Sequence, residues 1–408
     1  MTSAGGRRRR ESAGHGHSHD LDASGLDDAD PTSAVLRTAL TVIVAMVGIA
    51  AAAAMVVLWP SGDDVVPQGY RGEQVSTEIT AIQKCPNERE CLQATAEVDG
   101  QPRKVMLPVG SNAPSFSIGD KILVNSASDQ AAGVGQNGAG QYSFLDFDRT
   151  EPLIWLTVLF VLAVLLLSRW RGFTSLVSLG LSLLVVTVFV VPALIDGTNP
   201  LAVALTASAL IMIVSIYASQ GLAVRSSVAI VGTLVSLAVA GTIGAAFTEA
   251  GNFTGFSDES TKFLVAIVGD VDVRGLLLAG LIIGALGVLD DVTVTQTAAV
   301  WEIAAADPAA SRRAVFASAM RIGRSHVSAT VNTLVLAYVG ASIPLLMLMA
   351  ATNASAGEQL RYEGVAQEIV RGLAGGLGIV AAVPITTALA ALVVRRGTPA
   401  EDREAQPR

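Results

Sequence analysis

Charged and aromatic residues are scarce in this 408-residue chain, and the scarcity excludes several classes of protein. Charged residues make up 15% and aromatic residues 5%, whereas soluble domains carry about 25% charged residues. The net charge of −8 argues against nucleic acid as a partner, because proteins that bind it concentrate basic residues. The sequence also lacks a nucleophile elbow, an HExxH motif and a P-loop. We therefore expect neither an enzyme nor a bound cofactor.

Cysteine is almost absent as well. Cys85 and Cys91 are the only two, separated by five residues within a polar segment. If that segment is exported, an oxidising compartment favours a single disulfide between them. Two free thiols are the alternative. A metal site is not expected, because two ligands without a nearby histidine are too few.

Long apolar runs are what the chain has in abundance. Apolar residues make up 51%, the mean hydropathy is +0.54, and a membrane span needs about 20 of them in succession. Residues 35–58 meet this requirement, as do seven further segments within 152–396. The sequence thus predicts a mostly α-helical, polytopic transmembrane bundle of about eight spans. Residues 262–273 are too short to span, and we interpret them as an interfacial or re-entrant piece or the outer end of the sixth span.

Both ends of the chain are polar and low in complexity. Residues 1–33 and 397–408 cannot bury enough apolar surface to fold, and we expect them to be tails. His15, His17 and His19 offer only weak metal binding, since no fixed geometry holds them.

Basic residues predict the orientation. Arg37, Arg169, Arg225, Arg321 and Arg395 all fall at loops on one side of the predicted bundle, and cytoplasmic loops carry the excess of arginine and lysine. This places both termini in the cytoplasm and the protein in the bacterial plasma membrane, with the lipid bilayer as its main partner.

A polar segment between the first two spans must then be exoplasmic. Within residues 61–130, polar and apolar residues alternate between Asp-Gly and Gly-Asp turns, which is typical of strands. We expect a small all-β domain, OB-like in architecture, that offers a surface to an envelope protein partner. Residues 131–150, which are rich in glycine, are predicted to link it to the bundle.

The stretch "GALGVLDDVTVTQTAAVW", residues 284–301, carries two acids inside an apolar run. Gly280, Gly284, Gly287, Asp291 and Thr295 fall on one helical face, and small residues let a neighbouring membrane helix approach closely. We therefore expect Asp291 to face a neighbour and to hold a cation or proton, with Thr295 orienting it. Asp290 lies on the adjoining stripe and is expected to tune the site.

Candidate partners for this carboxylate follow in the next span. Asn332 lies one to two turns inside it, and Arg321 and Arg324 stand at its cytoplasmic entrance. Residues 307–324 read as a short amphipathic helix with Asp307 as N-cap and Pro308 at its first position. Two other interpretations stay open: the acid pair ends the span at the cytoplasmic interface, or it forms a buried structural ion pair.

The stretches "GALGVLDDVTVTQ" and "AMRIGRSHVSATVNTLVLAYVGASIPLLML", with one leading span and an outer β domain, resemble the YibE/YibF family of bacterial multi-span membrane proteins. The resemblance covers roughly residues 35–395. It maps the Asp-Val pair of the family onto Asp291-Val292 and makes Asp290 the variable neighbour. The family has no settled biochemical activity, so the resemblance supports the topology and leaves the function open.

Three functions compete on the sequence alone. The first is a transporter, or a transport-coupled component, with an intramembrane carboxylate site. The second is a non-catalytic envelope scaffold or assembly protein that acts through its exoplasmic β domain. The third, an intramembrane aspartic protease, is disfavoured because adjacent acids on one helix point about 100° apart.

Overall fold

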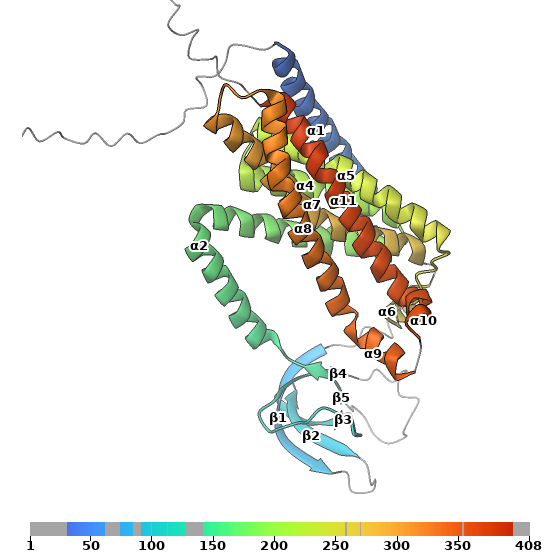
Figure 1. Cartoon of the computed structure of the whole chain (residues 1–408). Helices are drawn as coiled ribbons and strands as arrows, with labels where there is room; N and C mark the ends of the chain where they lie inside the picture. Colours follow the sequence, from blue (N-terminus) through green and yellow to red (C-terminus); the bar gives the residue numbers. More distant parts are fainter. Residues whose placement is uncertain are drawn as a thin grey trace, which may run out of the picture.

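The computed structural model describes residues 31–61, 74–84, 91–98, 100–111, 113–126, 142–257, 259–269, 271–352 and 355–394. It has two parts, a bundle of long helices and a small β-barrel (Figure 1). His15, His17, His19 and Cys85 lie outside the described residues, so the tail and disulfide predictions stay predictions.

Seven helical segments of the described chain are long and apolar enough to cross a membrane, which makes this a membrane-embedded protein. They are α1 (Pro31–Val57), two arms of α2 (Thr150–Val185) and its continuation, α4 (Pro200–Gln220), α5 (Val224–Ala250), α7 (Val273–Ala306) and α11 (Glu363–Val393). An eighth span arises if α8 (Arg312–Ala341) and α9 (Ile343–Ala351), bent by 54°, count as one. The predicted number of about eight agrees with this range.

The short elements are η3 (Val186–Val190), α3 (Val191–Ile195), α6 (Glu259–Val268) and α10 (Ala356–Arg361). The ten-residue α6 overlaps residues 262–273, the segment expected to be too short to span. It packs no fully buried residue, as expected for a surface piece.

The two arms of α2 meet at a sharp kink. Arg169 has φ 51° and ψ −125°, in a region that non-glycine residues seldom adopt. Gly172 allows the chain to double back, because a Cβ there would lie 2.7 Å from the carbonyl oxygen of Val164. The first arm, Thr150–Trp170, has no buried residue, whereas the second, Gly172–Ile195, packs on α4. The kink thus replaces the loop expected near Arg169.

The segment after α7 differs from the prediction. Asp307 ends α7, and Ser311 caps the next helix by accepting a hydrogen bond from the amide of Ala314. That helix, α8, then runs without a break from Arg312 to Ala341. The prediction of a separate amphipathic helix capped by Asp307 is therefore wrong, because residues 307–311 form the turn that ends α7.

The bundle has two distinguishable ends. At one, the Arg37 guanidinium of α1 donates to the carbonyl oxygen of Val393 in α11 at 2.8 Å; we name this the terminal end. At the other, the Ser61 amide donates to Asp196 at 2.7 Å, and the Gly255 amide donates to Glu363 at 2.7 Å. The barrel lies near this second end, the barrel end (Figure 1). The predicted alternation of spans is thus reproduced.

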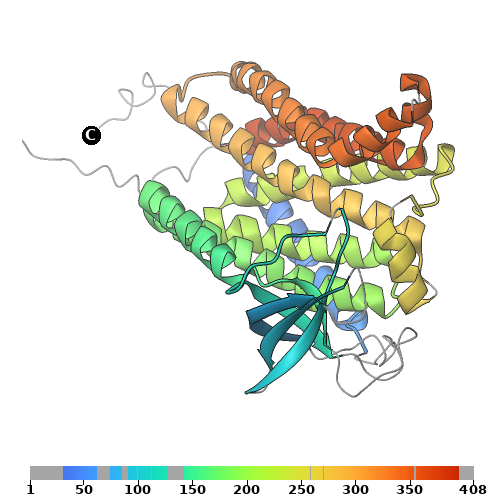
Figure 2. The same ribbon diagram turned by 90° about the horizontal axis from the view of Figure 1, so that it is seen from below.

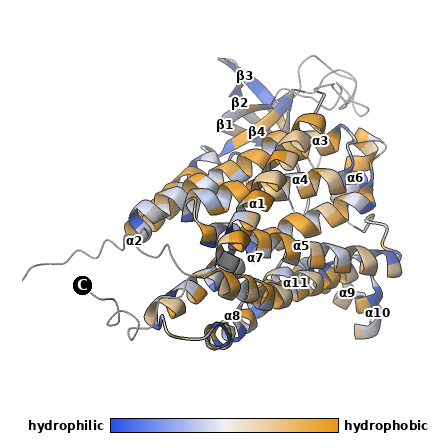
Figure 3. Cartoon of the chain, turned by 90° about the horizontal axis from the view of Figure 1, so that it is seen from above, coloured by the Kyte–Doolittle hydropathy of each residue, from blue (hydrophilic) through white to orange (hydrophobic). Residues whose placement is uncertain are grey.

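The core of the bundle is formed by α5, α7 and α11, which pack most closely. A Cβ on Gly378 of α11 would lie 2.8 Å from the Cβ of Ala240 in α5, so the glycine permits this close approach. Seen from above, the helices are predominantly hydrophobic in colour and the strands more hydrophilic (Figure 3).

Five strands form a closed barrel in the order β1-β2-β3-β5-β4. They are β1 (Gln74–Lys84), β2 (Leu92–Val98), β3 (Gln101–Leu107), β4 (Lys121–Ser126) and β5 (Tyr142–Phe147). Ile79, Val105, Ile122 and Val124 are fully buried in its centre. The predicted linker at 131–150 differs from the structure in its second half, because β5 pairs with β4 and with β3. The barrel lies to one side of the bundle, beside α2 (Figure 2).

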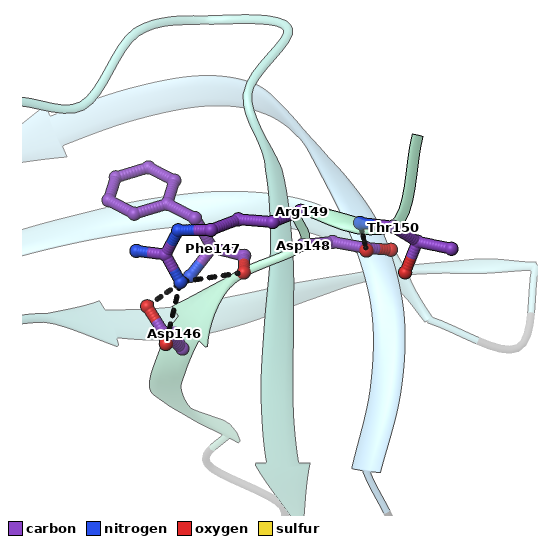
Figure 4. A network of polar contacts seen from close by, with 5 residues as sticks. All are labelled: Asp146, Phe147, Asp148, Arg149 and Thr150. Carbon is purple, nitrogen blue, oxygen red and sulfur yellow. Dashed lines mark hydrogen bonds and ion pairs between the residues drawn. The ribbon is translucent and has the colours of Figure 1, made fainter. Parts of the chain in front are cut away.

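Polar contacts fix the direction in which α2 leaves the barrel (Figure 4). Arg149 reaches back to the carboxylate of Asp146 at 2.8 Å and lies over the ring of Phe147. Asp148 accepts hydrogen bonds from the Ser76 hydroxyl and from the Thr150 amide. These hydrogen bonds lower the pKa of Asp148 to about 2, since they favour its charged form.

Candidate groove in the helical bundle

A groove of about 490 Å³ lies between the second arm of α2, α4 and α7. Its lining is apolar except for a set of oxygen-bearing side chains from all three helices. These are Ser175, Ser178, Ser182, Ser215, Ser219, Gln220, Asp290 and Asp291. Neither histidine nor cysteine lines it.

Both acids lie near the middle of α7. About 25 Å of helix extends from them in each direction, at 1.5 Å per residue. Val300, ten residues beyond Asp290, packs with Leu40 and Ala390 in the cluster at the terminal end. Asp290 is thus roughly 15 Å deeper in the bundle than that cluster. The helix continues well past the acids, which disfavours the interpretation that they end the span.

Asp290 points into the interface with α4. Its Oδ2 accepts a hydrogen bond of 3.2 Å from the Ser215 hydroxyl. Its Oδ1 is enclosed by protein and has no hydrogen-bond partner among the described residues. A carboxylate with one enclosed, unpaired oxygen costs free energy unless a proton or a cation completes it.

Asp291 occupies the exposed side of α7, together with Gly280, Gly284 and Gly287. A Cβ on Gly280 or Gly287 would meet nothing within 4 Å. This face approaches a neighbour at Gly284, where a Cβ would lie 3.3 Å from the Tyr338 hydroxyl oxygen of α8. Asp291 itself is exposed, so the expectation that it packs against a neighbouring helix is wrong for the described chain. The side of α7 that packs on its neighbours carries Leu289, Val292, Thr293 and Gln296 instead, and Asp290 adjoins it.

The other predicted site residues do not converge on the carboxylates. The Thr295 hydroxyl donates to the backbone carbonyl of Asp291 at 2.6 Å, so it binds its own helix and not the carboxylate. Asn332 and Arg324 are exposed on α8, and Arg321 donates to Ser318 at 3.0 Å. None of the three lines the groove.

The residues that sequence reasoning missed are serines. Ser175, Ser178 and Ser182 follow helical spacing within an apolar span, and Ser215 and Ser219 do the same in α4. Hydroxyls repeated on one face of an apolar helix were the available signal. These serines indicate a site only once the fold is known, because the fold places them opposite α7.

A second set of polar groups joins the packed side of α7 to α5, α8 and α11. The hydroxyls of Thr233 and Thr293 lie 2.6 Å apart, and both side chains are fully buried. The Gln296 amide donates to Thr387 at 2.8 Å and to the carbonyl oxygen of Ala319 at 3.0 Å. Thr293 also donates to the carbonyl of Asp290 at 3.1 Å. The register of the acids against α4 is thus fixed by α5, α8 and α11.

The chemistry of the groove is that of oxygen donors alone. Carboxylate and hydroxyl oxygens suit protons and hard cations, whereas soft metals prefer sulfur and imidazole. No cluster of three or more His, Cys, Asp or Glu side chains that could hold a metal occurs within the described ranges. The donor set is therefore one whose chemistry suits a proton or a hard cation.

The profile of the YibE/F-like protein family matches residues 156–396. This range covers more than half of the chain and includes all three helices of the groove. No curated protein and no solved structure matches significantly.

Proposed function

Because the chain belongs to the YibE/F-like protein family and is embedded in a membrane through its apolar helices, we propose that it is a multi-pass transporter, or a transport-coupled component. Its cargo is a proton or a hard cation, and its site is the groove between α2, α4 and α7. The role is non-enzymatic, and no cofactor takes part.

One observation carries this proposal: the carboxylate of Asp290 is enclosed near the middle of α7 and only partly satisfied. An ionisable side chain at that depth costs at least about 2.5–3.5 kcal/mol against lipid and is a functional candidate by default. Ser215 satisfies one oxygen, while the other has no partner in the part of the chain that is described. Such a carboxylate gains free energy by binding a proton or cation.

The surrounding residues support reversible binding. Hard cations take six or more oxygen ligands when dehydrated, and the groove supplies serine hydroxyls in addition to the two carboxylates. Asp290, the more enclosed of the two acids, would hold the cation, and Asp291 lies at the exposed side of the groove. Protonation of Asp290 would then release the cation. The sequence favoured Asp291 as the residue that holds the cation, whereas burial in the structure favours Asp290.

The orientation we propose follows the arginines. Arginine is frequent in the described chain at the terminal end: Arg37, Arg169, Arg225, Arg312 and Arg313. By the positive-inside rule, this end and both termini are cytoplasmic, and the membrane is the bacterial plasma membrane. The barrel is then exoplasmic, where a Cys85–Cys91 disulfide would form.

A second candidate function rests on the barrel. Its five strands agree with an OB-like architecture, and it exposes the apolar side chains of Ile118, Leu145 and Val109 at 69%, 47% and 46%. Exposed apolar groups of this kind serve protein contacts. We therefore retain an envelope scaffold, with a protein partner bound to the barrel, as the alternative.

Flux into proteoliposomes distinguishes the two functions. Purified full-length protein would be reconstituted, and uptake of protons, Na⁺, K⁺, Mg²⁺ and Ca²⁺ measured against protein-free liposomes. We expect flux of at least one ion above that background. If none of the five crosses faster than in protein-free liposomes, cation transport is refuted and the scaffold function takes its place.

A further inference from the structure

α8 is unusual among the long helices because it is polar on its exposed side. It is long and apolar enough to cross a membrane only together with α9. Its exposed polar residues repeat at helical spacing along one face: Arg321, Arg324, Ser325, Ser328 and Asn332. α8 lies at the edge of the bundle (Figure 3). We name these five residues the α8 stripe.

The α8 stripe cannot face lipid without cost. Charged and amide side chains inside the hydrocarbon region pair with protein groups or line water. Each member of the stripe is exposed, so the described chain itself does not cover it. Within the described chain, Arg321 donates to Ser318 at 3.0 Å; the rest of the stripe is open to water or to a partner outside the described residues.

An exposed acidic residue, Asp291, lies on α7, the helix that packs against α8. Thr295 is exposed on the same helix. The two helices run in opposite directions, since Gln296 contacts Ala319 whereas the earlier Gly284 lies near the later Tyr338. Gln296 of α7 donates to the carbonyl oxygen of Ala319 in α8, and this contact sets the relative depth. Asp291 and Arg324 each lie five residues from it towards the barrel end, so they occupy the same depth.

We propose that a second copy of this chain covers the face formed by α7 and α8. In a two-fold dimer with its axis along the membrane normal, the α7 side of one copy meets the α8 side of the other. Asp291 then lies opposite Arg324 of the partner subunit at equal depth, and the pair forms twice. Charge complementarity within a single chain selects a second copy over an unrelated partner.

The smaller residues of the stripe fit the same arrangement. Ser325 and Ser328 permit a close approach of helices, and Asn332 can hydrogen-bond across an interface. By the same depth relation, Ser328 is level with Gly287, which has open space beside its Cα. The dimer would close the exposed side of the groove while leaving Asp290 inside it. It does not depend on what the groove carries.

Two charge reversals test the interface in lipid nanodiscs by native mass spectrometry. Asp291→Arg and Arg324→Asp would each be made in the full chain, with Arg361→Asp as a control, since Arg361 is exposed at the barrel end. We expect wild type and control to be dimeric and each reversal alone to lose at least ten-fold in dimer. Mixed together, the two reversed chains should form heterodimers, because both contacts become attractive again.

A disulfide cross-link provides a second test that does not depend on the folding of the charge-reversed variants. In a background with Cys85→Ser and Cys91→Ser, one copy carries Gly287→Cys and a co-expressed copy carries Ser328→Cys. Oxidation should give a disulfide-linked heterodimer. A monomeric wild type, reversals that dimerise like wild type, or a mixture without heterodimers in which the cross-link also fails would overturn the proposal.

Discussion

Gly323 in α8 provides a sharp test of how α7, α8 and α11 pack. It is buried, and a Cβ added there would lie 2.5 Å from Val383 Cγ1 and 2.7 Å from Gln296 Oε1. Carbon atoms in contact normally stay about 3.5–4.0 Å apart, so Gly323→Ala must displace α8 or its neighbours by about 1 Å. Overpacking of this kind costs about 1–3 kcal/mol.

Gly340→Ala is the matched control on the same helix. A Cβ at Gly340 meets nothing within 4 Å, and alanine favours a helix over glycine by up to about 1 kcal/mol. Unfolding in mixed detergent and SDS would measure both variants. We expect Gly323→Ala to be less stable than wild type, Gly340→Ala to be at least as stable, and Val383→Ala to rescue part of the Gly323→Ala loss. Equal stability of Gly323→Ala and wild type would refute the packing.

Three further outcomes are expected outside the bundle. Intact mass without reductant should be two hydrogens lighter than the reduced chain if Cys85 and Cys91 are linked; an unshifted mass excludes the disulfide. After reduction, a membrane-impermeant maleimide should label both cysteines in intact cells, and labelling only after permeabilisation would invert the topology. In a carboxyl NMR titration, Asp148 should titrate near pH 2, and Ser76→Ala should raise its pKa. Because the folded pKa lies below the unfolded one, the stability from Asp148 is complete above about pH 4 and is lost as pH falls towards 2; a pKa near 4 in both proteins contradicts this.

The spans and the barrel strands were predictable because their signals are local. An apolar run of sufficient length predicts a membrane helix, and alternation with turn residues predicts strands. The strand β5 was not predicted, because the glycine-rich residues before it resemble a linker and its partner strand β3 is distant in sequence. Ser311 replaced Asp307 as the cap because both residues suit that role and only tertiary structure decides where α7 ends.

The site was harder, because a helical wheel shows which residues share a face and not which face has a neighbour. Gly280, Gly284, Gly287 and Asp291 do share a face, yet that face is exposed. The apolar residues of α7 are spread around the whole helix, so hydrophobicity could not identify its packed side. Ser215 donates to Asp290 although the two residues are 75 positions apart in the sequence. No periodicity in the sequence predicts a contact of this kind.

The central claim is that Asp290 carries the cargo, and the comparison of Asp290→Asn with Asp291→Asn tests it most directly. Both variants keep the side-chain volume, lie next to each other on α7 and would be reconstituted at matched protein density for flux of the ion that wild type carries. We predict that Asp290→Asn falls to the rate of protein-free liposomes while Asp291→Asn retains measurable flux. Full activity of Asp290→Asn, or a greater loss in Asp291→Asn, would contradict the account.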